Sequence, residues 1–364
     1  MPKVSRQNLQ EIIASKGGLH LTAYVQGSSD TSELRRKIGS IVFSALEQLI
    51  QGTPASARRK LLSPILSLML DSERLKRLPS SFVIFRNQNM FRILQVSLPL
   101  EDQCFVANTF HVKPLLEWLQ LNQDYLILTI ERERAMLFCG NHTGINKWAE
   151  LTDGEQISSQ DISSTTRRRG RSAWDRNVSE WIQKELGKLP KRNRPKLYLA
   201  GEKSFVLPVF RKLRYRNISL TWAGNPIEEH SLSRIEAAIR EELDAEAKSR
   251  IRQTFKEFHL ADDLSLGCRN LFDIASAAVK GRVSKLVVSS DMQIFGKIDE
   301  ASGRLKLNPG DSDHEDDDIL DDLAQLVLAT GGEVQLAPLS EMPKGWPAVA
   351  ILHPAARENQ LSTL

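Results

Sequence analysis

Short apolar runs of strand length alternate with amphipathic helical segments along most of this chain. Residues 125–130, 196–200, 285–289 and 333–337 are mainly apolar runs bounded by polar or glycine-containing segments, which is typical of buried strands. Between them, apolar residues recur at three- and four-residue spacing, the pattern of one helix face. This alternation predicts α/β and α+β layers, in which helices cover the faces of sheets.

The same patterns divide the chain into three predicted domains. Residues 1–124 combine helices with a hairpin at 82–98 and are expected to form a mixed α+β domain. A new hairpin begins at Tyr125 and opens an α/β domain over residues 125–260, and residues 261–364 are expected to form an α-β-α domain. A length of 364 residues is sufficient for about two or three domains.

Two local expectations depend on single residues. Pro64 falls inside a helical pattern and predicts a break or kink near Ser63, because proline lacks the amide that an inner helical turn needs. Residues 264–280 are expected to form one helix that ends at Gly281.

Composition places the chain among ordinary soluble proteins. The chain is 41% hydrophobic and 26% charged, and no apolar run approaches the roughly 20 residues that span a bilayer. The first residues lack the apolar core of a signal peptide, so no membrane partner and a cytoplasmic location are expected. Cys104, Cys139 and Cys268 lie far apart and are expected to be buried small hydrophobes. No nucleotide-binding fingerprint or Ser-His-Asp order is present, so no cofactor is expected.

A cluster of four arginines around one glycine precedes an amphipathic helix. Residues 158–172 are predicted as a loop because they start with small or polar residues without periodicity, and Ser172 is the expected N-cap of the helix. A helix N-terminus favours anions, and guanidinium groups bind phosphate in a bidentate manner. The cluster therefore predicts contact with the repeated phosphates of a nucleic acid, with a solvated basic loop as the alternative. Its members are Arg167, Arg168, Arg169, Gly170 and Arg171.

Charge is distributed unevenly around a net value of +4. Residues 184–216 are rich in lysine and arginine and contain only Glu185 and Glu202 as acids, so this segment is expected to meet a polyanion. Residues 311–322 are mostly acidic. A run that opens a helix without the spaced ligands of a calcium loop is more typical of a solvated helix cap than of a metal site. No metal is expected.

Residues 274–295 resemble the C-terminal domain of archaeal and eukaryotic class-I release factors and Pelota. In that domain a helix ends in a Gly-x-Val step before a hydrophobic strand and a short acidic turn, and residues 320–338 continue the pattern. Residues 110–116, followed by the hairpin at Tyr125, resemble the first domain boundary of bacterial release-factor-like families. The resemblance covers essentially the whole chain. It implies a ribonuclease-H-like middle domain and a C-terminal domain like the ribosomal kink-turn binders.

The arginine cluster is also where the chain departs from these families. In true release factors a Gly-Gly-Gln motif before the middle-domain helix promotes hydrolysis of peptidyl-tRNA, and the glutamine position corresponds here to Arg171. Since that hydrolysis needs a compact neutral group, while arginine prefers phosphate, no catalytic residue is expected. The C-terminal domain also lacks the Gly-x-Asn-Glu signature with which its relatives hold kink-turn RNA.

Together these features predict a translation or ribosome-associated factor that binds the ribosome or tRNA through the RNA backbone. A protein partner that binds the C-terminal domain is a further hypothesis. The alternative is an enzyme, either a divergent peptidyl-tRNA hydrolase or an RNA nuclease, which Asp175 and Glu180 near the arginines suggest. Metal-dependent nucleases of the implied fold need carboxylates that converge from separate strands, whereas Glu131, Glu133 and Asp153 lie at predicted turns. His111 and Lys113, at the end of the first domain, are expected to serve capping or packing, with a functional pair as the alternative. The expected RNA-binding residues are Arg167, Arg168, Arg169, Gly170, Arg171, Lys191, Arg192 and Arg194.

Overall fold

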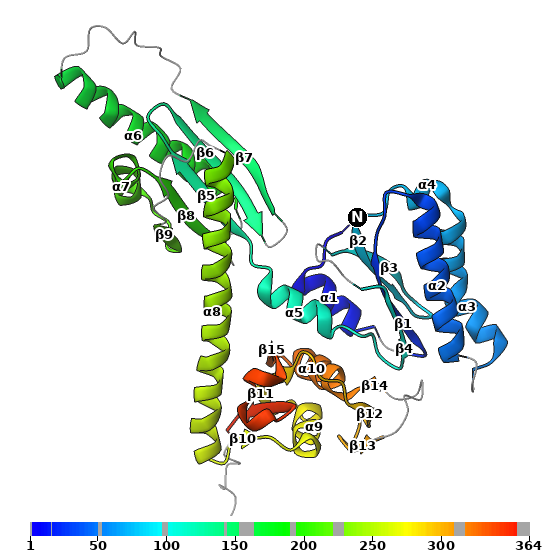
Figure 1. The fold of residues 1–364 in the computed structure, drawn as a ribbon. Coiled ribbons are helices and arrows are strands. Elements are labelled where there is room, and N and C mark those ends of the chain that lie inside the picture. Colours follow the sequence, from blue (N-terminus) through cyan, green and yellow to red (C-terminus); the bar gives the residue numbers. More distant parts are fainter. Residues whose placement is uncertain are drawn as a thin grey trace, which may run out of the picture. The chain divides into compact units, whose positions relative to one another are not determined.

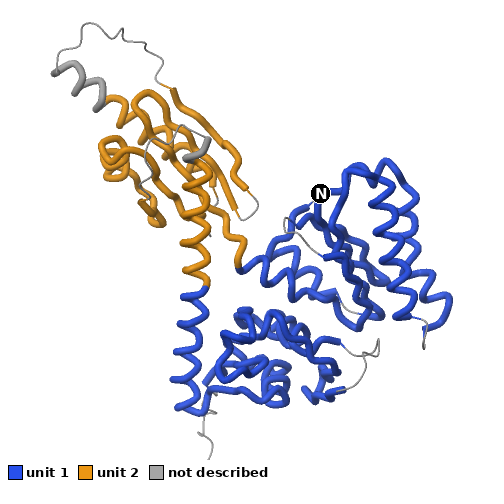
Figure 2. Tube along the Cα trace, viewed as in Figure 1, with its two compact units in different colours: residues 1–120, 248–364 blue, residues 121–247 orange. Residues whose placement is uncertain are grey.

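A computed structural model describes residues 2–15, 17–49, 53–96, 101–141, 144–152, 164–189, 194–220, 229–308 and 317–354, without the side chains of 164–172 and 229–231. The chain divides into two compact units (Figures 1 and 2). Unit 1 comprises residues 1–120 and 248–364, and unit 2 comprises residues 121–247. The predicted boundary near residue 260 falls inside a helix, α8 (Glu229–Asp263), which contributes to both units.

The N-terminal part of unit 1 is an antiparallel sheet with helices on both faces. The strand order is β3-β2-β1-β4, and helices α2 and α3 pack together on one face. Helices α1 and α5 line the other face, and the short α4 follows α3. The elements are α1 (Arg6–Ile13), β1 (His20–Gln26), α2 (Thr31–Leu49), α3 (Ala55–Leu70), α4 (Ser72–Leu75), β2 (Ser81–Arg86), β3 (Phe91–Gln95), β4 (Gln103–Ala107) and α5 (Lys113–Leu121).

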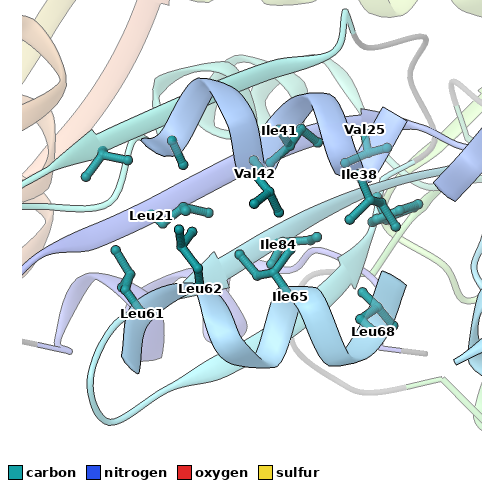
Figure 3. Close-up of a cluster of buried hydrophobic side chains, with 14 of the residues drawn as sticks. Leu21, Val25, Ile38, Ile41, Val42, Leu61, Leu62, Ile65, Leu68 and Ile84 are labelled. Carbon is teal, nitrogen blue, oxygen red and sulfur yellow. The ribbon is translucent and has the colours of Figure 1, made fainter. Parts of the chain in front are cut away.

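Alternation along β1 and β2 builds a core on each face of this sheet. Successive side chains of a strand point to opposite faces. Leu21 and Val25 therefore join Ile84 in the cluster that packs on α2 and α3 (Figure 3), whereas Tyr24 and Phe85 join the cluster on the α1 and α5 side. Because both faces are covered, nearly every residue of these two strands is buried.

A break or kink was expected near Leu62 and Ser63, and the break is wrong, because α3 (Ala55–Leu70) continues through Pro64. A proline at this position leaves the carbonyl four residues before it, that of Lys60, without its amide donor. Arg86 supplies a donor in its place: its Nη2 donates to the carbonyl of Lys60 at 2.9 Å, and its Nε donates to the adjacent carbonyl of Leu61 at 3.1 Å. A side chain from β2 thus replaces the backbone hydrogen bonding that Pro64 removes.

Unit 2 contains a five-stranded mixed sheet in the order β7-β6-β5-β8-β9. Strand β6 is antiparallel to both of its neighbours, while β5, β8 and β9 are parallel. Helices α6 and α7 cover one face, and the first half of α8 covers the other. The elements are β5 (Tyr125–Ile130), β6 (Arg134–Asn141), β7 (Gly144–Thr152), α6 (Ser164–Gly187), β8 (Lys196–Gly201), α7 (Lys203–Lys212) and β9 (Ile218–Leu220). This is a mixed α/β layer structure, as the resemblance implied for the middle of the chain.

The C-terminal part of unit 1 is the predicted α-β-α sandwich. Its sheet has the order β10-β16-β11-β15, with α9 and α10 on one face and the second half of α8 on the other. A small sheet, β13-β12-β14, adjoins α10. The elements are β10 (Gly267–Cys268), α9 (Leu271–Val279), β11 (Val283–Ser289), β12 (Phe295–Ile298), β13 (Leu305–Leu307), β14 (Asp317–Asp318), α10 (Ile319–Ala329), β15 (Glu333–Ala337), two 3-10 turns (Leu339–Glu341 and Pro343–Gly345) and β16 (Ala348–Leu352).

The helix expected over 264–280 is shorter in the structure. Gly267 and Cys268 pair with β16 as a short strand, and the side chain of Asn270 caps α9 by accepting from the amide of Phe272 at 2.9 Å. Gly281, with φ of 64°, ends the helix as predicted. The three cysteines are free and only partly buried, rather than fully buried. Within the described ranges, no helix is long and apolar enough to cross a membrane.

Candidate nucleic-acid interface and the acidic joint of unit 1

The arginine cluster lies in helical backbone rather than in the predicted loop. Helix α6 starts at Ser164, so Ser172 is inside the helix and is not its N-cap. Arginine is a good helix former, and a single internal glycine costs only about 1 kcal/mol relative to alanine. Residues 153–163 and the side chains of Arg167, Arg168, Arg169 and Arg171 lie outside what the structure describes.

The rest of α6 is anchored to the sheet as the periodicity predicted. Trp174, Val178 and Ile182 are buried against the sheet. The indole Nε1 of Trp174 donates to the carbonyl of Glu131, just after β5, at 2.9 Å. Because Arg171 precedes Trp174 by three residues, this bond places the backbone of Arg171 about 5 Å along the helix axis from the end of the sheet where β5 finishes.

Only part of the second basic segment is available for a partner. Lys191 and Arg192 lie outside the described residues. The Lys188 ammonium pairs with Glu185 at 2.7 Å. Lys196 lies between Glu242 and Glu246, at 2.7 and 2.5 Å. Burial lowers the pKa of Lys196, but its hydrogen bonds to these two carboxylates outweigh burial and raise the pKa above its ordinary value. Lys196 thus holds α8 on the sheet.

Arg194, the remaining predicted contact, is half-buried next to an aromatic ring. Its guanidinium carbon lies 5.6 Å from the centre of the Tyr215 ring, within the range of a cation–π interaction. The hydroxyl of Tyr215 donates to the carbonyl of Pro195 at 2.6 Å. Tyr215 was not predicted as a site residue; its only sequence signal is its position between Arg214 and Arg216.

The carboxylates of the nuclease alternative differ in their surroundings. Glu131 is buried, and burial raises the pKa of its carboxyl despite the opposing charge of Arg134. Asp175 is buried, whereas Glu180 is exposed. Among the described residues, no three His, Cys, Asp or Glu side chains form a group that could hold a metal ion.

The acidic run, expected to be a solvated cap, is buried where it is described. Residues 311–316 lie outside the described ranges, but Asp317, Asp318, Asp321 and Asp322 are all at most 8% exposed. Asp318 is the N-cap of α10, as the position of the run suggested, because its side chain accepts from the amide of Leu320. The reason for the burial is that the N-terminal part of the chain covers these carboxylates.

Each of the four aspartates accepts a hydrogen bond from residues 108–113, the segment that leads into α5 and includes its first residue. Lys113 Nζ donates to Asp318 at 2.5 Å and to the carbonyl of Met292 at 2.6 Å. This pairing confirms the packing role expected of Lys113. The other three bonds run from the Asn108 amide to Asp317 at 3.0 Å, from the Thr109 hydroxyl to Asp322 at 2.7 Å, and from the Val112 amide to both oxygens of Asp321 at 3.1 Å.

Burial shifts the pKa values of two titratable groups in this acidic joint in opposite directions. Burial, with the charge of Asp318 adding to it, raises the pKa of Asp321 to about 8. Burial, with the charge of Lys113 adding to it, lowers the pKa of His111 to about 3. His111 Nδ1 and Asp321 Oδ2 are 3.7 Å apart, too far for a hydrogen bond.

No protein-family model matches the chain, and no curated protein sequence matches it. Solved structures similar to it include Dom34 of S. cerevisiae, a translation termination-like factor that interacts with Hbs1. The two chains are 10% identical, the match covers 98% of this chain and 95% of that chain, and the TM-score is 0.41. A second is archaeal Pelota, from a model of the ribosome-bound protein with ABCE1. It is 12% identical, the match covers 76% of this chain and 73% of that chain, and the TM-score is 0.41. The archaeal translation termination factor aRF1 has 14% identity, coverage of 96% of each chain, and a TM-score of 0.27.

Proposed function

We propose that this chain is a release-factor-like translation or ribosome-associated factor that binds the ribosome or tRNA through the RNA backbone. The observation that carries the proposal is the placement of four arginines in the first turns of α6, at one end of the unit 2 sheet. A helix N-terminus exposes amides that attract phosphate, and arginines at the same point add strong phosphate contacts. The cytoplasm is the proposed location.

Binding of this kind should depend weakly on RNA sequence. Phosphate contacts fix position and orientation, whereas base edges carry the sequence information. Because the proposed contacts are to phosphate, unrelated RNAs should bind with similar affinity.

Peptidyl-tRNA hydrolysis is not part of the proposal. When this chain is compared with release factors, Arg171 occupies the position of their glutamine. A bulky cation at that position would keep the backbone away from the ester bond of peptidyl-tRNA. A peptidyl-tRNA release assay on ribosomes should therefore give background rates. Release that disappears on changing Arg171 would show that the enzyme alternative is right, and RNA cleavage that requires magnesium would show the nuclease.

Co-sedimentation with ribosomes tests the proposal. The wild-type protein should pellet with ribosomes at low salt, and a variant with Arg167, Arg168, Arg169 and Arg171 changed to alanine should remain largely in the supernatant. A matched control changes four exposed cations of unit 1 to alanine (Arg59, Arg77, Lys280 and Lys306) and should still pellet. If all three proteins sediment equally, the arginines of α6 do not make the contact.

A further inference from the structure

The end of α7 and the turn that leads from it to β9 carry a second group of cations that differs from the rest of the basic segment. Lys188 and Lys196 are held by glutamates. In contrast, Arg211, Lys212, Arg214 and Arg216 are all exposed, and none of them forms an ion pair with a described residue. No acidic residue occurs between Lys203 and Leu220, so this turn has no local counter-charge in the sequence.

The turn is held firmly although its cations are exposed. Tyr215, between Arg214 and Arg216, is only 8% exposed. Its hydroxyl donates to the carbonyl of Pro195 at 2.6 Å, and the guanidinium of Arg194 lies over its ring. On the other side, the Leu197 amide donates to the carbonyl of Asn217 at 2.9 Å, which fixes the start of β9. Bonds on both sides of Arg216 therefore restrict the backbone that carries the two arginines.

The helix dipole accounts for two of these four exposed cations. Arg211 and Lys212 lie in the last turn of α7, where cations complement the negative end of the helix dipole. Arg214 and Arg216 lie beyond the helix, where this effect has faded. Exposed like charges on a fixed backbone are favourable when a polyanion neutralises them.

We propose that Arg211, Lys212, Arg214 and Arg216 form a second phosphate-binding surface for RNA, with Tyr215 as the residue that positions it. This inference rests on the proposed function and adds a contact separate in sequence from the arginines of α6. An RNA backbone suits the turn better than an acidic protein because phosphates repeat along the strand and pair with guanidinium groups in a bidentate manner.

Salt-dependent binding to poly(U) tests the inference. Each phosphate contact contributes about 0.7 to the slope of log affinity against log salt for a single strand, so changing all four cations to alanine should reduce the slope by about 3. The unit 1 control variant, which loses the same charge, should keep the wild-type slope. The pair variant R214Q/R216Q, which disturbs the turn less, should lose about half as much. Y215F removes no charge; it should keep the slope and weaken binding severalfold.

The outcomes separate this inference from the function on which it rests. If the wild-type protein does not bind poly(U) or ribosomes, both fail. If it binds but the four-alanine variant matches the unit 1 control, only the second surface is wrong. If poly-L-glutamate of equal charge competes as well as poly(U), the surface is not specific for phosphate and the assignment to RNA is overturned. An unchanged affinity for Y215F would remove the positioning role.

Discussion

Lys113 and Asp318 form a buried ion pair in which each side chain is 4% exposed. Removing one partner of such a pair leaves the other charge buried without compensation, which typically costs about 3 to 5 kcal/mol. We therefore expect Lys113→Ala to lower the free energy of unfolding of unit 1 by that amount in a urea titration. The variant K113M/D318N, which removes both charges, should lose much less. A cost for Lys113→Ala below about 1 kcal/mol, typical of exposed pairs, would contradict this account.

The neighbouring Asp321 and His111 give a second prediction, for stability against pH. A carboxyl whose pKa is raised in the folded state stabilises the fold fully at a pH below its unfolded-state pKa. For Asp321 this contribution is lost as the pH rises to about 8. His111, with its pKa lowered to about 3, acts in the opposite direction only below its ordinary value of 6.5. Between pH 6.5 and 8, His111 does not oppose the loss of stability that Asp321 causes. Burial also raises the pKa of Asp322, so this carboxyl likewise lowers stability as the pH rises.

Unfolding of unit 1 by urea at pH 6.5 and pH 8 measures this effect. The wild-type protein should be less stable at pH 8, because each proton that only the folded state holds contributes about 1.4 kcal/mol per pH unit. Asp321→Asn keeps an oxygen that accepts from the Val112 amide and should reduce the loss. A wild-type protein as stable at pH 8 as at pH 6.5 would show that Asp321 is ionised throughout.

At the scale of elements, α3 depends on Arg86 for the Lys60 carbonyl, which Pro64 leaves without its amide donor. Arg86→Ala should lower stability by about 1 kcal/mol, the usual net value of a hydrogen bond. In a Pro64→Ala background the helix regains its own amide at position 64, so the same Arg86→Ala change should cost less. Urea titrations of the four proteins form a double-mutant cycle, and strict additivity would mean that Arg86 does not substitute for the missing amide.

The sequence predicted those elements that are determined by neighbouring residues. The apolar run of β2 and the three- and four-residue spacing after Trp174 give the correct elements, and that spacing also gives the buried face of α6. The start of α6 was misplaced because eight helical residues precede Ser172, and the polar arginine segment has no apolar period. Long-range partners were also missed. Asp318 was expected in solvent because Lys113, 205 residues earlier, gives no local sign that it will pair with it.

At the scale of the whole molecule, charged side chains stabilise unit 1, and we propose that they bind RNA in unit 2. One buried ion pair and several hydrogen bonds join the N-terminal and C-terminal parts of unit 1. In unit 2, the cations at the end of α7 and in the turn to β9 are exposed, and four arginines lie in the first turns of α6. The two kinds of site predict different responses to salt, since buried pairs are screened much less than exposed charges.

The salt dependence of RNA binding by the arginines of α6 tests the central claim most directly. Affinity for poly(U) is measured from low to moderate salt for the wild-type protein and for the variant with Arg167, Arg168, Arg169 and Arg171 changed to alanine. If all four meet phosphate, the slope of log affinity against log salt should fall by about 3, and by a similar amount for an unrelated RNA sequence. An unchanged affinity and slope would contradict the claim and leave the start of α6 as a solvated basic helix.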